Sequence, residues 1–210
     1  MQSSVRRIPI GSFFLEGILS IPLEAQGIIL FVHGSGSSRL SPRNNFVARV
    51  LNEAHFATFL VDLLSKEEDL NYETRFDIDL LTKRVEKMID WIKQEEGIKE
   101  LPLGLFGAST GAAAAIQSVI TKEKEVLAIV SRGGRPDLAK ESLPLVKVPT
   151  LLIVGGEDGE VIKLNEYAYL ALQGVKKLEI IPHATHLFEE PGCLEQVAEL
   201  AKNWFFSHLT

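Results

Sequence analysis

Continuous apolar runs of strand length recur along the chain and alternate with amphipathic segments. The runs are Gly27–Val32, Ala57–Val61, Leu103–Phe106, Val126–Val130 and Thr150–Val154. Uninterrupted runs of this length are typical of strands buried on both faces of a parallel sheet. Apolar positions at helical spacing predict the intervening helices Asn44–Ala54, Phe76–Glu96, Thr110–Thr121 and Val161–Leu172. The alternation predicts right-handed crossovers with helices on both faces of the sheet.

The two ends of the chain complete this pattern. Val5–Ile10 and Phe13–Ile21 are β-prone and separated by a Gly-Ser pair, which predicts an antiparallel hairpin at a sheet edge. Val175–Ile181 predicts a last strand and Leu194–Leu209 a last amphipathic helix. Neither repeats nor linkers interrupt the order, so residues 1–210 are expected to form a single α/β domain.

Composition narrows the class of protein. With 46% hydrophobic and 24% charged residues, the chain resembles an ordinary globular protein. Its net charge of −6, without a cluster of basic residues, argues against nucleic acid as a partner. The lone Cys193 and the absence of a signal-like apolar start favour a cytoplasmic location, and no apolar stretch is long enough to span a membrane. A small molecule is the expected partner, and a homo-oligomer is compatible with this composition.

A candidate nucleophile follows the third apolar run. Gly107–Gly111 reads Gly-Ala-Ser-Thr-Gly and lies between the strand Leu103–Phe106 and the helix Thr110–Thr121. This strand–turn–helix context is that of a nucleophile elbow, in which Ser109 sits in a strained turn that only small neighbours permit. The alternative is a glycine-rich turn capped by a serine.

The loop His33–Ser38 follows the first apolar run and reads His-Gly-Ser-Gly-Ser-Ser. Its exposed backbone predicts that the amides of Ser35 and Thr110 bind an oxyanion, with Gly36 in place of Ser35 if the loop is shifted by one residue. His33 is then structural. A phosphate cradle is the alternative, but the loop lacks the lysine of a P-loop.

A candidate acid, Asp158, follows the run Thr150–Val154. A carboxylate at this rim can orient an imidazole and stabilise its cation. Glu157 and Asp137 are rival acids, and a turn residue before glycine is the alternative role for Asp158.

A candidate base, His186, follows the last strand, with His183 as its competitor. The chain order Ser109, Asp158, His186 is the order of an α/β-hydrolase triad.

Two arginines lie on another loop at the same rim. Arg132 and Arg135 belong to the segment Ser131–Asp137. Either guanidinium could bind a substrate carboxylate. The alternative is a set of ion pairs with Asp137 or Glu190 that holds the loops together.

These segments together resemble the α/β-hydrolase superfamily, and the chain is similar to its dienelactone hydrolase-like branch. The segments that carry the resemblance are Arg75–Leu81, Phe106–Ala115, Ser131–Ala139, Leu151–Val161 and Ala184–Gly192. They look like a group in that branch of which some members are fused to phosphoribosyltransferase domains. Dienelactone hydrolases carry cysteine at the elbow where this chain has Ser109, so the resemblance does not extend to dienelactone as the substrate.

The resemblance implies a triad of Ser109, Asp158 and His186 that needs no metal or organic cofactor. The expected activity is that of a serine hydrolase on a small ester, lactone or thioester. Two alternatives stay open at this point. One is acyl transfer or amide cleavage on the same triad, and the other is a catalytically idle hydrolase fold that senses a ligand or binds a partner. Only eighteen residues, Ser131–Val148, join the fourth and fifth apolar runs, so no large cap is expected there.

Overall fold

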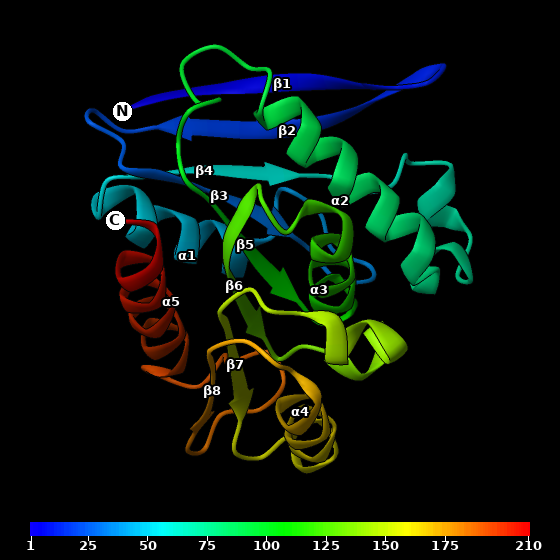
Figure 1. The fold of residues 1–210 in the computed structure, drawn as a ribbon, viewed down its shortest axis with the longest axis vertical. Coiled ribbons are helices and arrows are strands. Elements are labelled where there is room, and N and C mark those ends of the chain that lie inside the picture. Colours follow the sequence, from blue (N-terminus) through cyan, green and yellow to red (C-terminus); the bar gives the residue numbers. More distant parts are fainter.

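Eight strands form one sheet in the order β1-β2-β4-β3-β5-β6-β7-β8 in the computed structural model, which describes residues 1–210 (Figure 1). The strands are β1 (Gln2–Ile10), β2 (Phe13–Ile21), β3 (Gly27–Val32), β4 (Phe56–Val61), β5 (Leu103–Ala108), β6 (Val126–Arg132), β7 (Thr150–Gly155) and β8 (Lys176–Ile181). β1 and β2 form an antiparallel hairpin that joins β4, and all pairs from β3 onward are parallel. The predicted fold class is confirmed.

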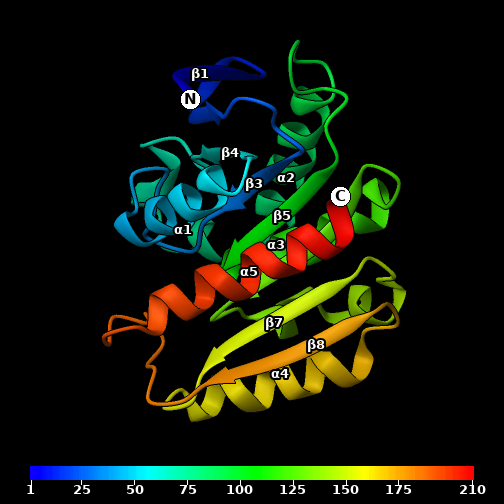
Figure 2. The same cartoon turned by 90° about the vertical axis from the view of Figure 1, so that its left-hand side faces the viewer.

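Helices cover both faces of this sheet (Figure 2). The helices are α1 (Pro42–Glu53), α2 (Ile78–Ile92), α3 (Thr110–Lys122), α4 (Gly159–Ala171) and α5 (Cys193–Leu209). α1 and α5 pack on one face, and α2, α3 and α4 pack on the other. Short 3-10 helices η1 (Glu68–Leu70), η2 (Thr74–Phe76) and η3 (Pro136–Leu145) lie in the loops after β4 and β6.

Several helix boundaries differ from their predicted positions. α2 ends at Ile92, four residues early, and α4 spans Gly159–Ala171 in place of the predicted Val161–Leu172. Local capping explains where α1 and α2 begin. α1 begins earlier than expected, at Pro42, and the Ser41 side chain accepts a hydrogen bond from the Asn44 amide. α2 begins at Ile78 because the Asp77 carboxylate accepts the Leu80 amide at 2.9 Å. In both helices, the polar side chain of the residue before the helix therefore caps the first turn.

The central strands are buried along their whole length. Every residue of β3, β4, β5 and β7 is buried, as their uninterrupted apolar sequences predict. Separate apolar clusters fill the two faces, and Phe31 and Phe106 pack at 4.8 Å between ring centroids in the α1/α5 cluster. This packing holds the strand ends, and therefore the loops that follow them, in fixed positions.

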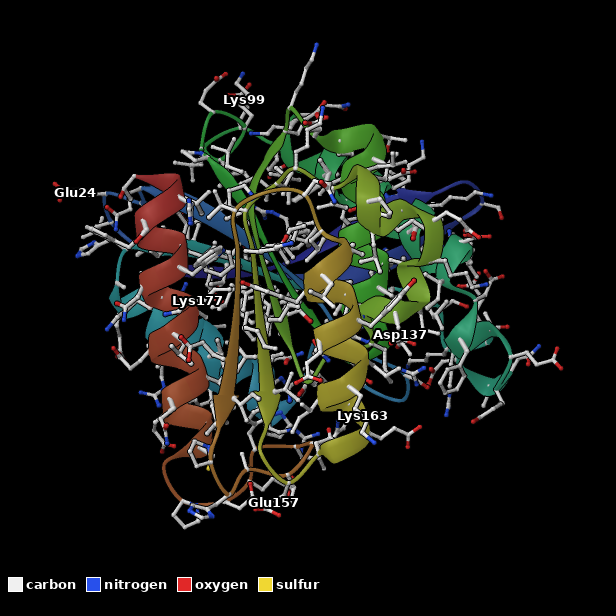
Figure 3. The ribbon with its side chains drawn as sticks, turned by 60° about the horizontal axis from the view of Figure 1, so that its bottom comes forward. Glu24, Lys99, Asp137, Glu157, Lys163 and Lys177 are labelled. Carbon is white, nitrogen blue, oxygen red and sulfur yellow. The ribbon has the colours of Figure 1, made fainter.

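Loops that follow the parallel strands gather at one edge of the sheet. In Figure 3, Glu157, which follows β7, lies at one end of the molecule, and Lys99, which precedes β5, lies at the other. The carboxyl ends of parallel strands are where α/β sheets bind ligands. No helix of the chain has the length and apolar character needed to cross a membrane.

Candidate active site

Ser109 occupies the sharp turn between β5 and α3. Its backbone has φ 51° and ψ −125°, a region that non-glycine residues rarely adopt. Small neighbours are required here: a Cβ on Gly107 would lie 2.5 Å from Ala112 Cα, and one on Gly111 would lie 2.2 Å from the Val32 carbonyl oxygen. The turn has the strained geometry that the Gly-x-Ser-x-Gly spacing predicts, at the amino end of a 13-residue helix.

His186 and Asp158 form a hydrogen-bonded pair in the loops after β8 and β7. Nδ1 of His186 lies 2.7 Å from Oδ2 of Asp158. Asp158 is the residue before α4, yet its side chain makes no capping bond to that helix, so its carboxylate is free to bind the imidazole. The Asp158 side chain is 17% exposed and that of His186 is 40% exposed. A carboxylate at Nδ1 favours the tautomer with a proton there, which leaves Nε2 as the basic atom.

The rival acids and the rival base are placed differently. Asp137 accepts two hydrogen bonds from Arg135, both at 2.9 Å. Glu157 is exposed at the outer end of the molecule (Figure 3). His183 is exposed and makes no side-chain hydrogen bond. Among the candidates, only His186 and Asp158 are joined to each other.

Ser109 and His186 both adjoin the segment after β6, although no hydrogen bond joins their side chains. The Ser109 amide donates to the Arg132 carbonyl at 3.4 Å, and the Arg135 amide donates to the Ser109 carbonyl at 3.0 Å. Gly133, at φ 50°, lies so near His186 that an added Cβ would be 3.1 Å from the His186 carbonyl oxygen. Catalytic hydrogen bonds are often long before substrate binds. The sequence shows this Gly-Gly pair, but not that Gly133 lies against the histidine.

The expected oxyanion donors are only partly available. The Thr110 amide makes no hydrogen bond, as an oxyanion donor requires. The Ser35 amide, in contrast, donates to Thr110 Oγ1 at 3.0 Å and is therefore occupied in this structure. The Gly36 amide, which the shifted loop would use, is unbonded. Gly34 lets the loop lie against the nucleophile, because a Cβ there would be 2.8 Å from Ser109 Cβ.

His33 ties the loops after β3 and β4 together. Its Nδ1 lies 2.9 Å from the Gly34 carbonyl oxygen, and its Nε2 accepts the Leu63 amide at 3.1 Å. These contacts require a neutral ring with the proton on Nδ1. Burial lowers the pKa of His33, which keeps the ring neutral. Both ring nitrogens are occupied, so the side chain is structural, as predicted.

The loop that carries His186 is braced from within. The Glu190 carboxylate accepts hydrogen bonds from the Thr185 amide at 3.1 Å and the Thr185 hydroxyl at 2.6 Å. The Thr185 hydroxyl lowers the pKa of Glu190, so the carboxylate stays charged. Phe188, two residues after the histidine, is fully buried in the α1/α5 cluster and anchors the loop there. Sequence reasoning considered Glu190 only as a partner for arginine and missed this role.

Comparison with solved structures places this site in a known fold. A dienelactone hydrolase from Anabaena variabilis is 51% identical, with a TM-score of 0.96 over 100% of this chain and 99% of that chain. The chain belongs to the dienelactone hydrolase-like branch of the α/β-hydrolase superfamily. It is a hydrolase. Est1E from Butyrivibrio proteoclasticus shares the fold at 15% identity and a TM-score of 0.82, covering 97% of this chain and 98% of that chain.

Curated relatives of this hydrolase are longer proteins. Two sequences from Mycobacterium tuberculosis, provisionally named phosphoribosyl transferases, are 52% identical over 195 residues, which is 93% of this chain. The match spans 44% of the length of those relatives. No family model matches the chain.

The two rim arginines of this hydrolase differ in their surroundings. Arg135 is held by Asp137 through two hydrogen bonds, which raise the pKa of Arg135. Arg132 is 7% exposed and forms no ion pair. The ion-pair alternative therefore holds for Arg135 and fails for Arg132. Cys193 is buried, and that burial raises the pKa of its thiol, which makes it a poor nucleophile.

Proposed function

We propose that this protein hydrolyses a small ester, lactone or thioester through an acyl-enzyme formed on Ser109. The observation that carries the proposal is the His186–Asp158 pair, 2.7 Å apart, at the same strand edge as a serine in a strained turn. A serine alone is a weak nucleophile at neutral pH and needs an oriented base beside it. The pair supplies that base.

Each step follows from these positions. His186 Nε2 takes the Ser109 hydroxyl proton as Oγ attacks the carbonyl carbon, and the Thr110 amide stabilises the resulting oxyanion. His186 then gives the proton to the leaving oxygen or sulfur, and the bond to the leaving group breaks. Water, deprotonated by His186, releases the acid and restores Ser109. Asp158 stays ionised and stabilises the imidazolium.

A second oxyanion donor comes from the loop after β3. The Gly36 amide is already unbonded, whereas the Ser35 amide becomes available once the Thr110 hydroxyl turns away from it. If Gly36 is the second donor, the Thr110 side chain does not have to move. We favour Gly36 as the second donor on this ground.

Substrate size follows from what surrounds the strand edge. The segment Ser131–Val148 contains only η3 and inserts no cap, so nothing from it encloses a long acyl chain. The loop after β4 exposes apolar side chains: Leu70, Tyr72 and Phe76 are 86%, 71% and 41% exposed. Side chains that are this exposed do not enclose an acyl chain. Each methylene of the acyl chain that stays in water loses about 0.8 kcal/mol of binding free energy relative to a buried one. Short acyl groups are expected.

Labelling with a fluorophosphonate probe and turnover of 4-nitrophenyl acetate test the proposal. We expect wild type to be labelled at Ser109, and Ser109→Ala and His186→Ala to lose nearly all turnover, because triad members act as a unit. His183→Ala is the matched control and should retain turnover. Loss of activity in His183→Ala with activity kept in His186→Ala would show that the base is wrongly assigned.

The phosphoribosyl transferase name of the M. tuberculosis relatives is not proposed for this chain. The aligned region covers 44% of those relatives, so their named activity belongs to proteins more than twice this length. The site described above accounts for acyl chemistry within the aligned part.

A further inference from the structure

Arg132 is a buried cation without a counter-charge. The residue is 7% exposed, and the only hydrogen bond of its guanidinium runs from Nη2 to Asn44 Oδ1 at 3.2 Å. Its Nε is buried and has no partner. Every other arginine except the exposed Arg7 has a carboxylate within ion-pair distance. Burial, and then repulsion from Arg43, lower the pKa of Arg132 to about 10.

A second arginine adds to the positive charge at this place. Arg43, in the first turn of α1, also has a buried Nε without a partner. Its one ion pair is with Glu189 at 2.7 Å, whose side chain is 62% exposed. A water-exposed carboxylate compensates little of a buried charge. Of these two guanidinium groups, only that of Arg43 has a carboxylate partner, and that carboxylate is exposed to water.

Arg132 adjoins Ser109 through its backbone, and its side chain reaches the loop that carries His186. Arg132 ends β6 opposite Ala108, and its carbonyl accepts the Ser109 amide. Its guanidinium carbon lies 5.9 Å from the ring centroid of Phe188, two residues beyond His186. The side chain thus extends between the amino end of α1 and the loop that carries the base.

We propose that Arg132, reinforced by Arg43, binds an anionic oxygen group on the substrate, a carboxylate or a phosphate remote from the scissile carbonyl. This inference rests on the proposed hydrolysis at Ser109 and specifies its substrate class. Uncompensated buried charge is costly, and a bound anion would remove that cost while directing the substrate to the nucleophile. Arg135, the other arginine that the sequence offers, is already neutralised by Asp137 and is not part of the site.

Matched esters test the inference. We compare kcat/KM for mono-4-nitrophenyl succinate, which carries a carboxylate, with that for its methyl ester, which does not. Wild type should prefer the acid by at least tenfold. Arg132→Met should lower that ratio at least tenfold, Arg132→Lys should restore part of it, and Arg135→Met should leave it unchanged. An unchanged ratio in folded Arg132→Met and Arg132→Lys would overturn the inference.

Direct binding separates this inference from the proposed function. Calorimetry on Ser109→Ala protein with succinate, and separately with inorganic phosphate, needs no turnover and shows which oxygen group is preferred. We expect binding of at least one anion that is lost when Arg132→Met is added. Neutral-ester turnover without anion binding would overturn the anion site alone. Anion binding that requires Arg132, in a protein that cleaves no ester, would overturn the proposed hydrolysis alone.

Discussion

Replacement of Ser109 by glycine should stabilise the protein, although it removes the nucleophile. The serine holds φ 51° and ψ −125°. A residue with a Cβ in such a sparsely populated region costs about 1–3 kcal/mol, whereas glycine adopts positive φ without a steric penalty. Glycine also has more conformational freedom to lose on folding, which offsets about 0.5–1 kcal/mol. The net gain in the free energy of unfolding is expected to be about 0.5–2 kcal/mol.

Ser109→Ala is the matched control because it removes the hydroxyl but keeps the Cβ. Its stability should stay within about 0.5 kcal/mol of wild type. Urea unfolding measures both variants, and for a protein of this size the glycine variant should melt about 1–8 °C higher. If Ser109→Gly were no more stable than Ser109→Ala, the turn would not store strain, and the argument from its backbone angles would be wrong.

Three further predictions concern single side chains. Burial lowers the pKa of His33, so below about pH 6.5 the unfolded chain takes up a proton that the folded protein does not. Stability should therefore fall as the pH drops from 7.5 to 5, and urea unfolding of His33→Asn should show a smaller fall. Arg132→Met should leave the free energy of unfolding unchanged or raise it by about 1 kcal/mol, because an apolar side chain replaces a buried cation that has no carboxylate partner. If urea unfolding showed a loss of more than about 2 kcal/mol, Arg132 would have a structural role. Asp158→Asn should lower kcat/KM for 4-nitrophenyl acetate roughly 10²–10⁴-fold, whereas Asp137→Asn, the rival acid, should change it less than about threefold.

The fold and the positions of the key residues could be predicted because both depend on patterns local to the sequence. Buried parallel strands appear as unbroken apolar runs, and their order fixes which loops meet at the carboxyl edge. Ser109 and Asp158 each follow such a strand, whereas His186 follows the edge strand β8, which is only partly buried. What the sequence left open was the choice between acids of the same type. That choice depends on the side chain each acid meets in space, which is His186 for Asp158 and Arg135 for Asp137.

Contacts between distant loops could not be predicted in the same way. The Ser35 amide bonds to a hydroxyl 75 residues away, and no local pattern marks a backbone donor as occupied. The exposed Leu70, Tyr72 and Phe76 lie in or beside the 3-10 helices η1 and η2, where no strand or helix pattern indicates which side chains are exposed. Both the occupied amide and the exposed side chains depend on the conformation of loops, which contacts with the rest of the fold determine.

Two features that lower the stability of the protein lie at the same edge of the sheet. The backbone at Ser109 is strained. The carbonyl of Arg132 accepts the Ser109 amide, and the guanidinium of Arg132 is buried without a counter-charge. Natural sequences are locally consistent in most places, and they keep such conflicts mainly where activity requires them. Because the strain and the buried charge have unrelated physical origins, their coincidence beside the His186–Asp158 pair supports the proposed site independently of any likeness to known proteins. If both Ser109→Gly and Arg132→Met stabilise the fold, the protein gives up stability at this edge for two separate reasons, catalysis and substrate charge.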